Sequence, residues 1–334
     1  MSRRLKRLVK KYFKALILLA LIVLVFLVWG GGYIFSSHRT FSYNVLPGAS
    51  VGSVANDLHD AGVFDSVSSF KMAVWLNGNR VQAGAYDIPH RASPWRIAKM
   101  LATGDIATTT VLIPEGMTII QTKKLLQQMP ELSGNIECEK TNTAPVCNLH
   151  DGDIFPDTYR VARGTSRLAV LDLARKKMIG IQEKVSVKHL PSPLKNWNDV
   201  LTLASIVQKE TPKVKEMPIV ASVYINRLNK NMRLQADPTV VYAITKGLGD
   251  MRGAALLSGH LKIDSPYNTY THNGLPPTPI ANVGLDAIRA VLHPADTNYL
   301  FFVADGKGGH KFANTYQEHI ANHATWRAIK KSRK

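Results

Sequence analysis

Residues 200–212 read VLTLASIVQKETP, and this stretch sets the architecture of the second half of the chain. Pro212 predicts the end of a helix here, because the residue before a proline avoids the α region. The apolar positions follow the spacing i, i+3, i+4, i+7 of one buried helix face. They are Val200, Leu203, Ala204 and Val207. We therefore expect a helix that packs one face against a core and ends beside Pro212.

Glu210 occupies the next position of this apolar face, at the carboxyl end of the predicted helix. Burial and the negative end of the helix dipole both disfavour a carboxylate, so both raise the pKa of this group. A carboxyl group that stays protonated near neutral pH can serve as a general acid. In the alternative interpretation, Glu210 pairs with Lys213 or another base on a solvated face.

Dense motifs follow this helix. They are SVYINRL at 222–228, MRLQADPTVVY at 232–242, SPYNTY at 265–270, GLPP at 274–277, and YLFFVA at 299–304 with GGH at 308–310. Together with residues 209–211, Lys-Glu-Thr, these motifs resemble the MltG (YceG-like) family of membrane-anchored endolytic murein transglycosylases. The chain departs from many relatives in having Gln208 where they have glutamate, which leaves Glu210 as the one acid of this step.

The resemblance implies an α+β, YceG-like catalytic domain over 107–334, with Glu210 as the catalytic residue. It implies cleavage of the β-1,4 bond between N-acetylmuramic acid and N-acetylglucosamine in nascent glycan strands, with formation of a 1,6-anhydro end. Such cuts would terminate glycan polymerisation. The implied partners are peptidoglycan strands, the inner membrane, and penicillin-binding proteins of the wall-synthesis machinery. Because the nucleophile comes from the substrate, no cofactor and no metal are expected.

Five polar residues in the motifs after Glu210 have polar groups suited to sugar hydroxyl and acetamide groups, and we expect them to bind substrate. They are Asn226, Gln235, Asp237, Asn268 and Tyr270. Alternatively, such side chains form hydrogen bonds inside the protein when they are buried. Asp237 also has two further interpretations, as the second acid of a lysozyme-like hydrolase or as an ordinary helix cap before Pro238. A non-catalytic glycan-binding scaffold is the alternative from another functional class.

The stretch from 36 to 106 predicts a small module. Strand-like residues 41–46 precede two short helices capped by Ser50 and Ser66, and strand-like residues 81–88 follow. A further helix begins at Ser93-Pro94, a cap followed by proline at the first helical position. The order strand, helix, helix, strand resembles the LysM module, which binds glycan chains. The alternative role is that of a spacer.

The first 35 residues predict a single membrane span. Residues 15–35 contain no charged side chain and are long enough to cross about 30 Å of hydrocarbon. The basic tail 1–14 precedes them, so the positive-inside rule predicts a cytoplasmic N-terminus and a periplasmic catalytic domain. A cleaved signal peptide is the alternative.

The charge and the cysteines narrow the functional class further. The formal net charge is +18, but the tails 1–14 and 327–334 supply twelve of these positive charges and contain no acid. The rest of the chain has a net charge of only +6, which argues against a nucleic-acid partner. Cys138 and Cys147 are the only cysteines, and a local disulfide between them suits an oxidising compartment. Two unpaired thiols are the alternative.

Two further patterns are more typical of structure than of ligand binding. Residues 305–309, Asp-Gly-Lys-Gly-Gly, predict a hairpin turn rather than a phosphate-binding loop, because P-loop spacing is missing. His319 and His323 stand four residues apart on the last predicted helix, which begins with a capping box at Thr315. They lack an evident third metal ligand.

Overall fold

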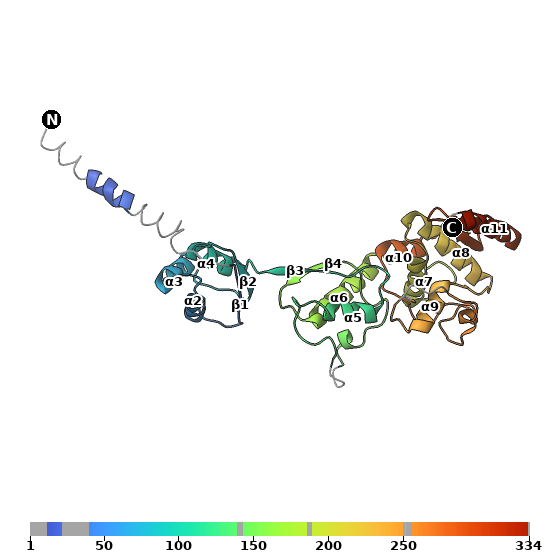
Figure 1. The fold of residues 1–334 in the computed structure, drawn as a ribbon, viewed down its shortest axis with the longest axis horizontal. Helices are drawn as coiled ribbons and strands as arrows, with labels where there is room; N and C mark the ends of the chain where they lie inside the picture. Colours follow the sequence, from blue (N-terminus) through green and yellow to red (C-terminus); the bar gives the residue numbers. More distant parts are fainter. Residues whose placement is uncertain are drawn as a thin grey trace, which may run out of the picture. The chain divides into compact units, whose positions relative to one another are not determined.

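The computed structural model describes residues 12–21, 40–138, 143–185, 189–249, 251 and 256–332. They form helices and two-stranded sheets, which confirms the predicted α+β class (Figure 1). The chain divides into two compact units. The first ends at Thr109 and also contains Arg160–Gly164, whereas the second contains Thr110–Tyr159 and the chain from Thr165 onward.

The predicted membrane anchor falls mostly outside the described residues. Residues 12–21 are helical with exposed side chains, whereas 22–35 are not described. Within the described ranges, no helix is both long enough and apolar enough to cross a membrane. The span over 15–35 therefore stays a prediction.

The first unit has the element order that the sequence predicts. Its elements are β1 (Phe41–Val45), α2 (Val51–Asp60), α3 (Val67–Leu76), β2 (Gly84–Ile88) and α4 (Pro94–Thr103). β1 and β2 pair in antiparallel orientation, and Tyr43 stands opposite Tyr86. The two strands and three helices enclose a core that includes Leu58, Phe70 and Ile97. The similarity to a LysM module beyond this element order stays a prediction.

Serine caps define the helices of the first unit. The side chains of Ser50, Ser66 and Ser93 each accept a hydrogen bond from the backbone N–H three residues later. This contact satisfies one of the N–H groups that a helix start leaves without a partner. Gly104 ends α4 in the left-handed conformation, with φ of +70°.

The second unit contains the longer helices. Its elements are β3 (Thr108–Leu112), α5 (Ile119–Gln127), β4 (Thr158–Ala162), α6 (Arg167–Val185), α7 (Trp197–Glu210), α8 (Met217–Asn229), α9 (Asp237–Thr245), α10 (Leu285–Leu292), β5 (Phe301–Ala304), β6 (His310–Ala313) and α11 (Tyr316–Ser332). The unit boundary falls within β3 and β4. Within the described ranges, single turns of 3₁₀ helix also lie at Pro145–Cys147, Val214–Glu216 and His260–Lys262.

Helix α7 is the centre of the second unit. The predicted apolar face is buried, but Leu201, Thr202, Ser205 and Ile206 are buried as well. The prediction of a single buried face was therefore incomplete, because α8, α9 and α10 all contact this helix. Ser205 Oγ donates to Thr202 O (2.7 Å) and accepts from Ile280 N (3.0 Å), which satisfies a buried hydroxyl on the side away from the apolar stripe.

The β5–β6 hairpin follows from local turn chemistry. Asp305 Oδ1 accepts hydrogen bonds from Lys307 N (2.6 Å) and Gly309 N (2.9 Å), so the turn closes on its own aspartate. This confirms the hairpin interpretation of 305–309. Helix α11, which packs against both strands, begins with the predicted capping box between Thr315 and Glu318.

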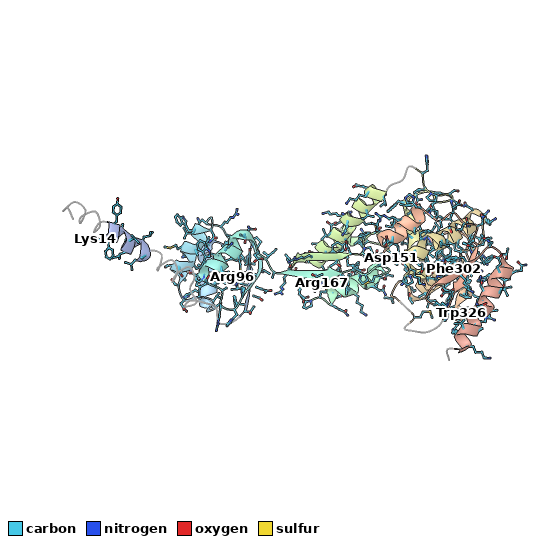
Figure 2. All side chains as sticks on the ribbon, turned by 90° about the horizontal axis from the view of Figure 1, so that it is seen from above. Lys14, Arg96, Asp151, Arg167, Phe302 and Trp326 are labelled. Atoms are coloured by element: carbon cyan, nitrogen blue, oxygen red, sulfur yellow. A yellow bond between two sulfur atoms is a disulfide. The ribbon has the colours of Figure 1, made fainter. Side chains whose placement is uncertain are left out.

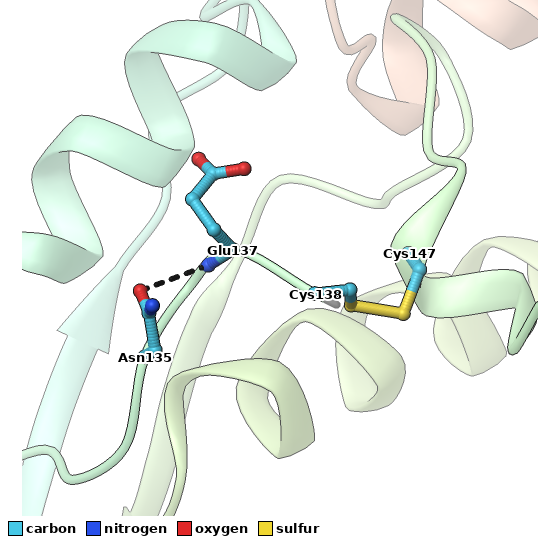
Figure 3. The surroundings of a disulfide bond; sticks show 4 residues. All are labelled: Asn135, Glu137, Cys138 and Cys147. Carbon is cyan, nitrogen blue, oxygen red and sulfur yellow. Dashed lines mark hydrogen bonds between the residues drawn. A yellow bond between two sulfur atoms is a disulfide. The ribbon is translucent and has the colours of Figure 1, made fainter. Parts of the chain in front are cut away.

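A disulfide joins Cys138 to Cys147, which confirms the predicted pairing (Figure 3). The bond closes a loop in the connection between α5 and β4. Glu137 N donates to Asn135 Oδ1 (3.1 Å) at the start of this loop. The cross-link restricts the unfolded chain and so stabilises a connection that has little secondary structure.

Candidate active site

Glu210 is the last residue of α7, and its side chain meets α8 rather than a solvated base. Tyr224 Oη donates a hydrogen bond to Glu210 Oε1 at 2.7 Å. Lys213 pairs with Glu216 instead, with Nζ 3.7 Å from Oε1. The alternative in which Glu210 forms an exposed ion pair with Lys213 is therefore wrong.

Burial raises the pKa of Glu210 to about 7, and it is the largest of several opposing effects. The hydrogen bond from Tyr224 lowers this pKa because it stabilises the carboxylate. The negative charge of Asp237 raises it, and the positive charge of Arg227 lowers it. Near neutral pH, Glu210 is therefore divided between a form that can donate a proton and a form that can accept one.

Two pockets meet at Glu210. The α9 pocket has a volume of about 330 Å³, and its walls include Thr118, Gln121, Val241, Tyr242 and Ile280. The α11 pocket has a volume of about 320 Å³, and its walls include Tyr224, Arg227, Gln235, Tyr270, Phe302 and His319. Glu210 and Asp237 line both pockets. A chain molecule bound across this point would have room on either side of the carboxyl group.

Asp237 lies beside Glu210 at the start of α9. Ala236 is the N-cap of α9, and Asp237 is the first helical residue. The interpretation of Asp237 as an ordinary helix cap is therefore wrong. Its Oδ1 instead accepts from Tyr270 Oη at 2.6 Å, which fixes the carboxylate at the junction of the two pockets.

Gln235 and Tyr270 line the α11 pocket together with Asp237. The backbone of Gln235 is left-handed, with φ of +49°, an unfavourable conformation for a residue with a side chain. Its backbone N–H donates to Thr269 O (3.1 Å), and Arg227 Nη1 donates to its Oε1 (3.4 Å). Strain of this kind is common at functional sites, where the surrounding contacts enforce it.

The other two predicted substrate-binding residues have structural contacts. Asn226 Nδ2 donates to the backbone oxygens of Thr297 (2.8 Å) and Tyr299 (3.1 Å). Asn268 is fully buried, and its Nδ2 donates to Leu261 O (3.1 Å) and Ile263 O (2.8 Å). Neither side chain is among the described residues that line the two pockets. Here the structure favours the alternative of internally bonded amides.

Sequence reasoning missed Tyr224 and Arg227, although both lie in the 222–228 motif. They are three residues apart on α8 and therefore share a helix face, the face toward Glu210. The guanidinium of Arg227 is buried and donates to Leu234 O (2.8 Å) and Leu300 O (2.6 Å). A tyrosine and an arginine at this spacing, next to a helix that ends in a candidate acid, were the available signal.

Buried polar contacts fix the wall of the α9 pocket. Asp151, labelled in Figure 2, accepts from Ile119 N (2.5 Å) at the start of α5 and from Tyr242 Oη (2.6 Å) on α9. Burial raises the pKa of this aspartate, although its two hydrogen bonds oppose the shift. Thr118 Oγ1 donates to Gly247 O (2.5 Å) nearby. These contacts tie α5 to α9 across one side of the pocket.

His319 and His323 both line the α11 pocket. The ring of His319 stacks on Phe301, with 5.3 Å between ring centroids, and burial lowers its pKa. Among the described residues, no group of three or more histidine, cysteine or acidic side chains is arranged to hold a metal ion. The two rings therefore contribute aromatic surface to the pocket.

The family model for YceG-like proteins matches residues 43–325, which covers both units and the whole pocket region. The chain belongs to the YceG-like family.

Known relatives are similar in sequence to this chain over most of its length. An endolytic murein transglycosylase of Bacillus subtilis is 30% identical over 85% of this chain and 84% of its own length. An endolytic murein transglycosylase of Streptococcus pneumoniae is 26% identical over 86% of this chain, which spans 58% of that relative. A crystal structure of a YceG-like protein of Listeria monocytogenes aligns with 85% of this chain and 99% of its own at 29% identity and a TM-score of 0.47.

Proposed function

We propose that this protein is an endolytic peptidoglycan lytic transglycosylase in which Glu210 is both general acid and general base. Family membership and the names of the relatives support the enzyme class. The observation on which the mechanism depends is a carboxyl group with a pKa of about 7 at the junction of two pockets. A group with this pKa exchanges its proton readily at neutral pH.

The proposed reaction uses one protein carboxyl group. Protonated Glu210 donates to the oxygen of the β-1,4 bond between N-acetylmuramic acid and N-acetylglucosamine, and the bond from C1 to that oxygen breaks. The C6 hydroxyl of the same muramyl residue attacks C1, and the Glu210 carboxylate accepts the hydroxyl proton. The products are a 1,6-anhydromuramyl end and a free N-acetylglucosamine 4-hydroxyl. The substrate supplies the nucleophile, as in substrate-assisted exceptions to the two-carboxylate pattern.

The two pockets support internal rather than terminal cleavage. Sugars on both sides of the scissile bond need space on both sides of the acid, and each pocket offers more than 300 Å³. Gln235, Asp237 and Tyr270 are proposed to bind the strand on the α11 side, where they line the pocket. In this proposal the cuts limit the length of newly made strands.

Asp237 favours one alternative chemistry, a lysozyme-like hydrolysis. Its carboxylate lines both pockets beside Glu210 and does not cap α9. A second carboxylate in this position can activate a water molecule or stabilise charge at C1. Hydrolysis would leave reducing muramyl ends instead of anhydro ends.

The cellular setting is part of the proposal. We propose a single span over residues 15–35, a cytoplasmic N-terminus and a periplasmic catalytic domain. The disulfide between Cys138 and Cys147 supports an oxidising compartment. There the enzyme would work on glycan strands beside the penicillin-binding proteins that make them.

The test is incubation of the purified full chain in detergent with murein, followed by mass spectrometry of the products. Wild-type protein should release 1,6-anhydro products and should shorten long strands early in the reaction. Glu210→Gln should lower the rate by about 10²- to 10⁴-fold, because it removes the proton donor. Glu183→Gln, an exposed change on α6, is the matched control and should leave the rate unchanged.

The value of kcat/KM should also fall as the pH rises. As pH rises above about 7, the acid form of Glu210 is lost, so kcat/KM should fall about tenfold per unit. Reducing ends together with a large loss in Asp237→Asn would favour hydrolysis. Full activity of Glu210→Gln, or binding of murein without any product from wild type, would refute the proposed mechanism.

A further inference from the structure

The chain directly after Glu210 is held by side-chain contacts. Thr211, the C-cap of α7, has extended backbone angles and is 1% exposed. Its Oγ1 accepts from Lys213 N (3.1 Å) and donates to Glu216 Oε2 (3.5 Å). The turn between α7 and α8 is thus fixed at the residue that follows the acid.

Glu216 connects this turn to the β5–β6 hairpin. His310 Nδ1 lies 2.8 Å from Glu216 Oε2, and His310 N donates to Glu216 Oε1 (3.4 Å). The two side chains are only 15% and 18% exposed. A Cβ atom at Gly309 would lie 2.3 Å from Glu216 Oε1, so any larger residue here would displace the Glu216 carboxylate from this position. The Gly-Gly-His motif therefore contacts the Glu216 carboxylate and holds it in place.

A second route leads from His310 to Glu210 through aromatic rings. His310 contacts Phe302 at 5.2 Å between centroids with an interplanar angle of 84°. Phe302, labelled in Figure 2, contacts Tyr224 at 5.8 Å and 87°. Tyr224 in turn donates its hydrogen bond to Glu210. Edge-to-face contacts of this kind fix ring orientation in a packed core.

We propose that Glu216 and His310 are positioning residues for the catalytic carboxyl group, an inference that rests on the proposed function. Glu216 fixes the backbone after Glu210 through Thr211, and His310 fixes the ring of Tyr224 through Phe302. The second route runs through Phe302 and Tyr224, which line the α11 pocket. Neither Glu216 nor His310 is among the described residues that line the two pockets. Their effect on the site therefore passes through Thr211 and through Phe302.

The test compares His310→Leu with His310→Asn in the full chain. His310→Leu removes the donor to Glu216, whereas the amide of asparagine restores a donor near the position of Nδ1. We expect His310→Leu to lower kcat about 10- to 100-fold with KM changed less than about threefold, because misplacement of a reacting group affects the chemical step. His310→Asn should recover most of that loss.

The pH profile separates a positioning role from a merely structural one. If the Tyr224 ring shifts, its hydrogen bond to Glu210 weakens, and this bond lowers the pKa of the acid. The alkaline limb of kcat/KM in His310→Leu should therefore move to higher pH. His59→Leu is the matched control, since it removes an exposed pair with Asp60 in the first unit, and it should leave kcat and the limb unchanged.

Two further variants keep the inference testable if His310→Leu fails to fold. Thr211→Val removes the hydroxyl between the turn and Glu216, and Thr211→Ser restores it. Gly309→Ala should act like His310→Leu, because it displaces Glu216. The inference is overturned if His310→Leu or Thr211→Val folds and keeps the wild-type kcat and the wild-type alkaline limb of kcat/KM. It is also overturned if the loss of kcat is fully explained by the fraction of unfolded protein. Failure of the proposed function would appear separately, as full activity of Glu210→Gln.

Discussion

The two pockets that meet at Glu210 differ in how they hold it. On the α11 side, Tyr224 donates to the carboxyl group, and the buried charge of Arg227 lowers its pKa. On the α9 side, the wall is tied together by Asp151 and Tyr242, and among the described residues no hydrogen bond runs from this wall to Glu210. The α11 side thus adjusts the proton affinity of the acid in addition to offering space for substrate, whereas the α9 side offers space alone. Changes to Tyr224 on the α11 side should therefore mainly alter kcat, whereas changes to Tyr242 on the α9 side should mainly alter KM.

The largest expected effect is on stability, and it measures how fully the acid is buried. A glutamate in the unfolded chain has a pKa near 4.5, against about 7 for folded Glu210. Between these values the folded state retains a proton that the unfolded state has lost, so stability falls as pH rises through this window. The full difference is about 3 kcal/mol. Relative to wild type, Glu210→Gln should gain about this much in free energy of unfolding at pH 8 compared with pH 4.

Urea denaturation at both pH values measures this gain, and Glu183→Gln, exposed on α6, is the control. An equal gain in both variants would mean that the effect is general. A Glu210→Gln variant with the same relative stability at pH 4 and pH 8 would contradict the burial of the acid and remove the basis of the comparison.

The next effect is on rate, from the α11 side. Tyr224→Phe removes the hydrogen bond to Glu210 and should lower kcat about tenfold, or about 1.4 kcal/mol. Because this bond favours the carboxylate, its loss raises the pKa of Glu210, and the alkaline limb of kcat/KM should move to higher pH. Steady-state rates against pH measure both changes.

Tyr159→Phe is the matched control for this variant. Tyr159 Oη donates to Phe155 O (2.5 Å), a buried contact elsewhere in the second unit, so its loss should cost stability without moving the limb. An equal change in the pH profile of Tyr224→Phe and Tyr159→Phe would contradict a specific role of Tyr224.

The smallest effect is on binding, from the α9 side. Tyr242→Phe removes the hydrogen bond to Asp151 and loosens the wall between α5 and α9. We expect KM to rise about threefold with kcat nearly unchanged, a cost of about 0.6 kcal/mol. Initial rates with soluble glycan strands of defined length measure the split. A fall in kcat equal to that of Tyr224→Phe would show that the two sides do not act separately.

Local signals in the sequence were sufficient for the element order of the first unit and for the position of Glu210 at the end of a buried helix. Ser50, Ser66 and Ser93 predict helix starts because a cap needs only the next three residues. Glu210 stands out because a charge interrupts an apolar helical pattern. Both inferences depend on neighbours within one or two helical turns.

The amide roles could not be predicted in the same way. An asparagine has the same donors whether it meets a sugar or a backbone carbonyl, and the partners of Asn226 lie 71 and 73 residues away. The burial of every residue from Val200 to Val207 on α7 has a similar origin, because it depends on α10, which lies far along the chain. The contact between Tyr224 and Glu210 joins two helices, so the spacing of Tyr224 and Arg227 on α8 indicates a shared face but not which residue that face meets.

The enclosure of α7 also limits how this fold can vary its cleavage position. One inserted residue would turn everything after it by about 100° around the helix axis. The final carboxyl group would then point away from the junction, and the buried faces that contact α8, α9 and α10 would lose their partners. Under the proposed function, a shift of the cut along the strand is therefore more accessible through the loops that bound the pockets, whereas the carboxyl group of Glu210 stays in a fixed register.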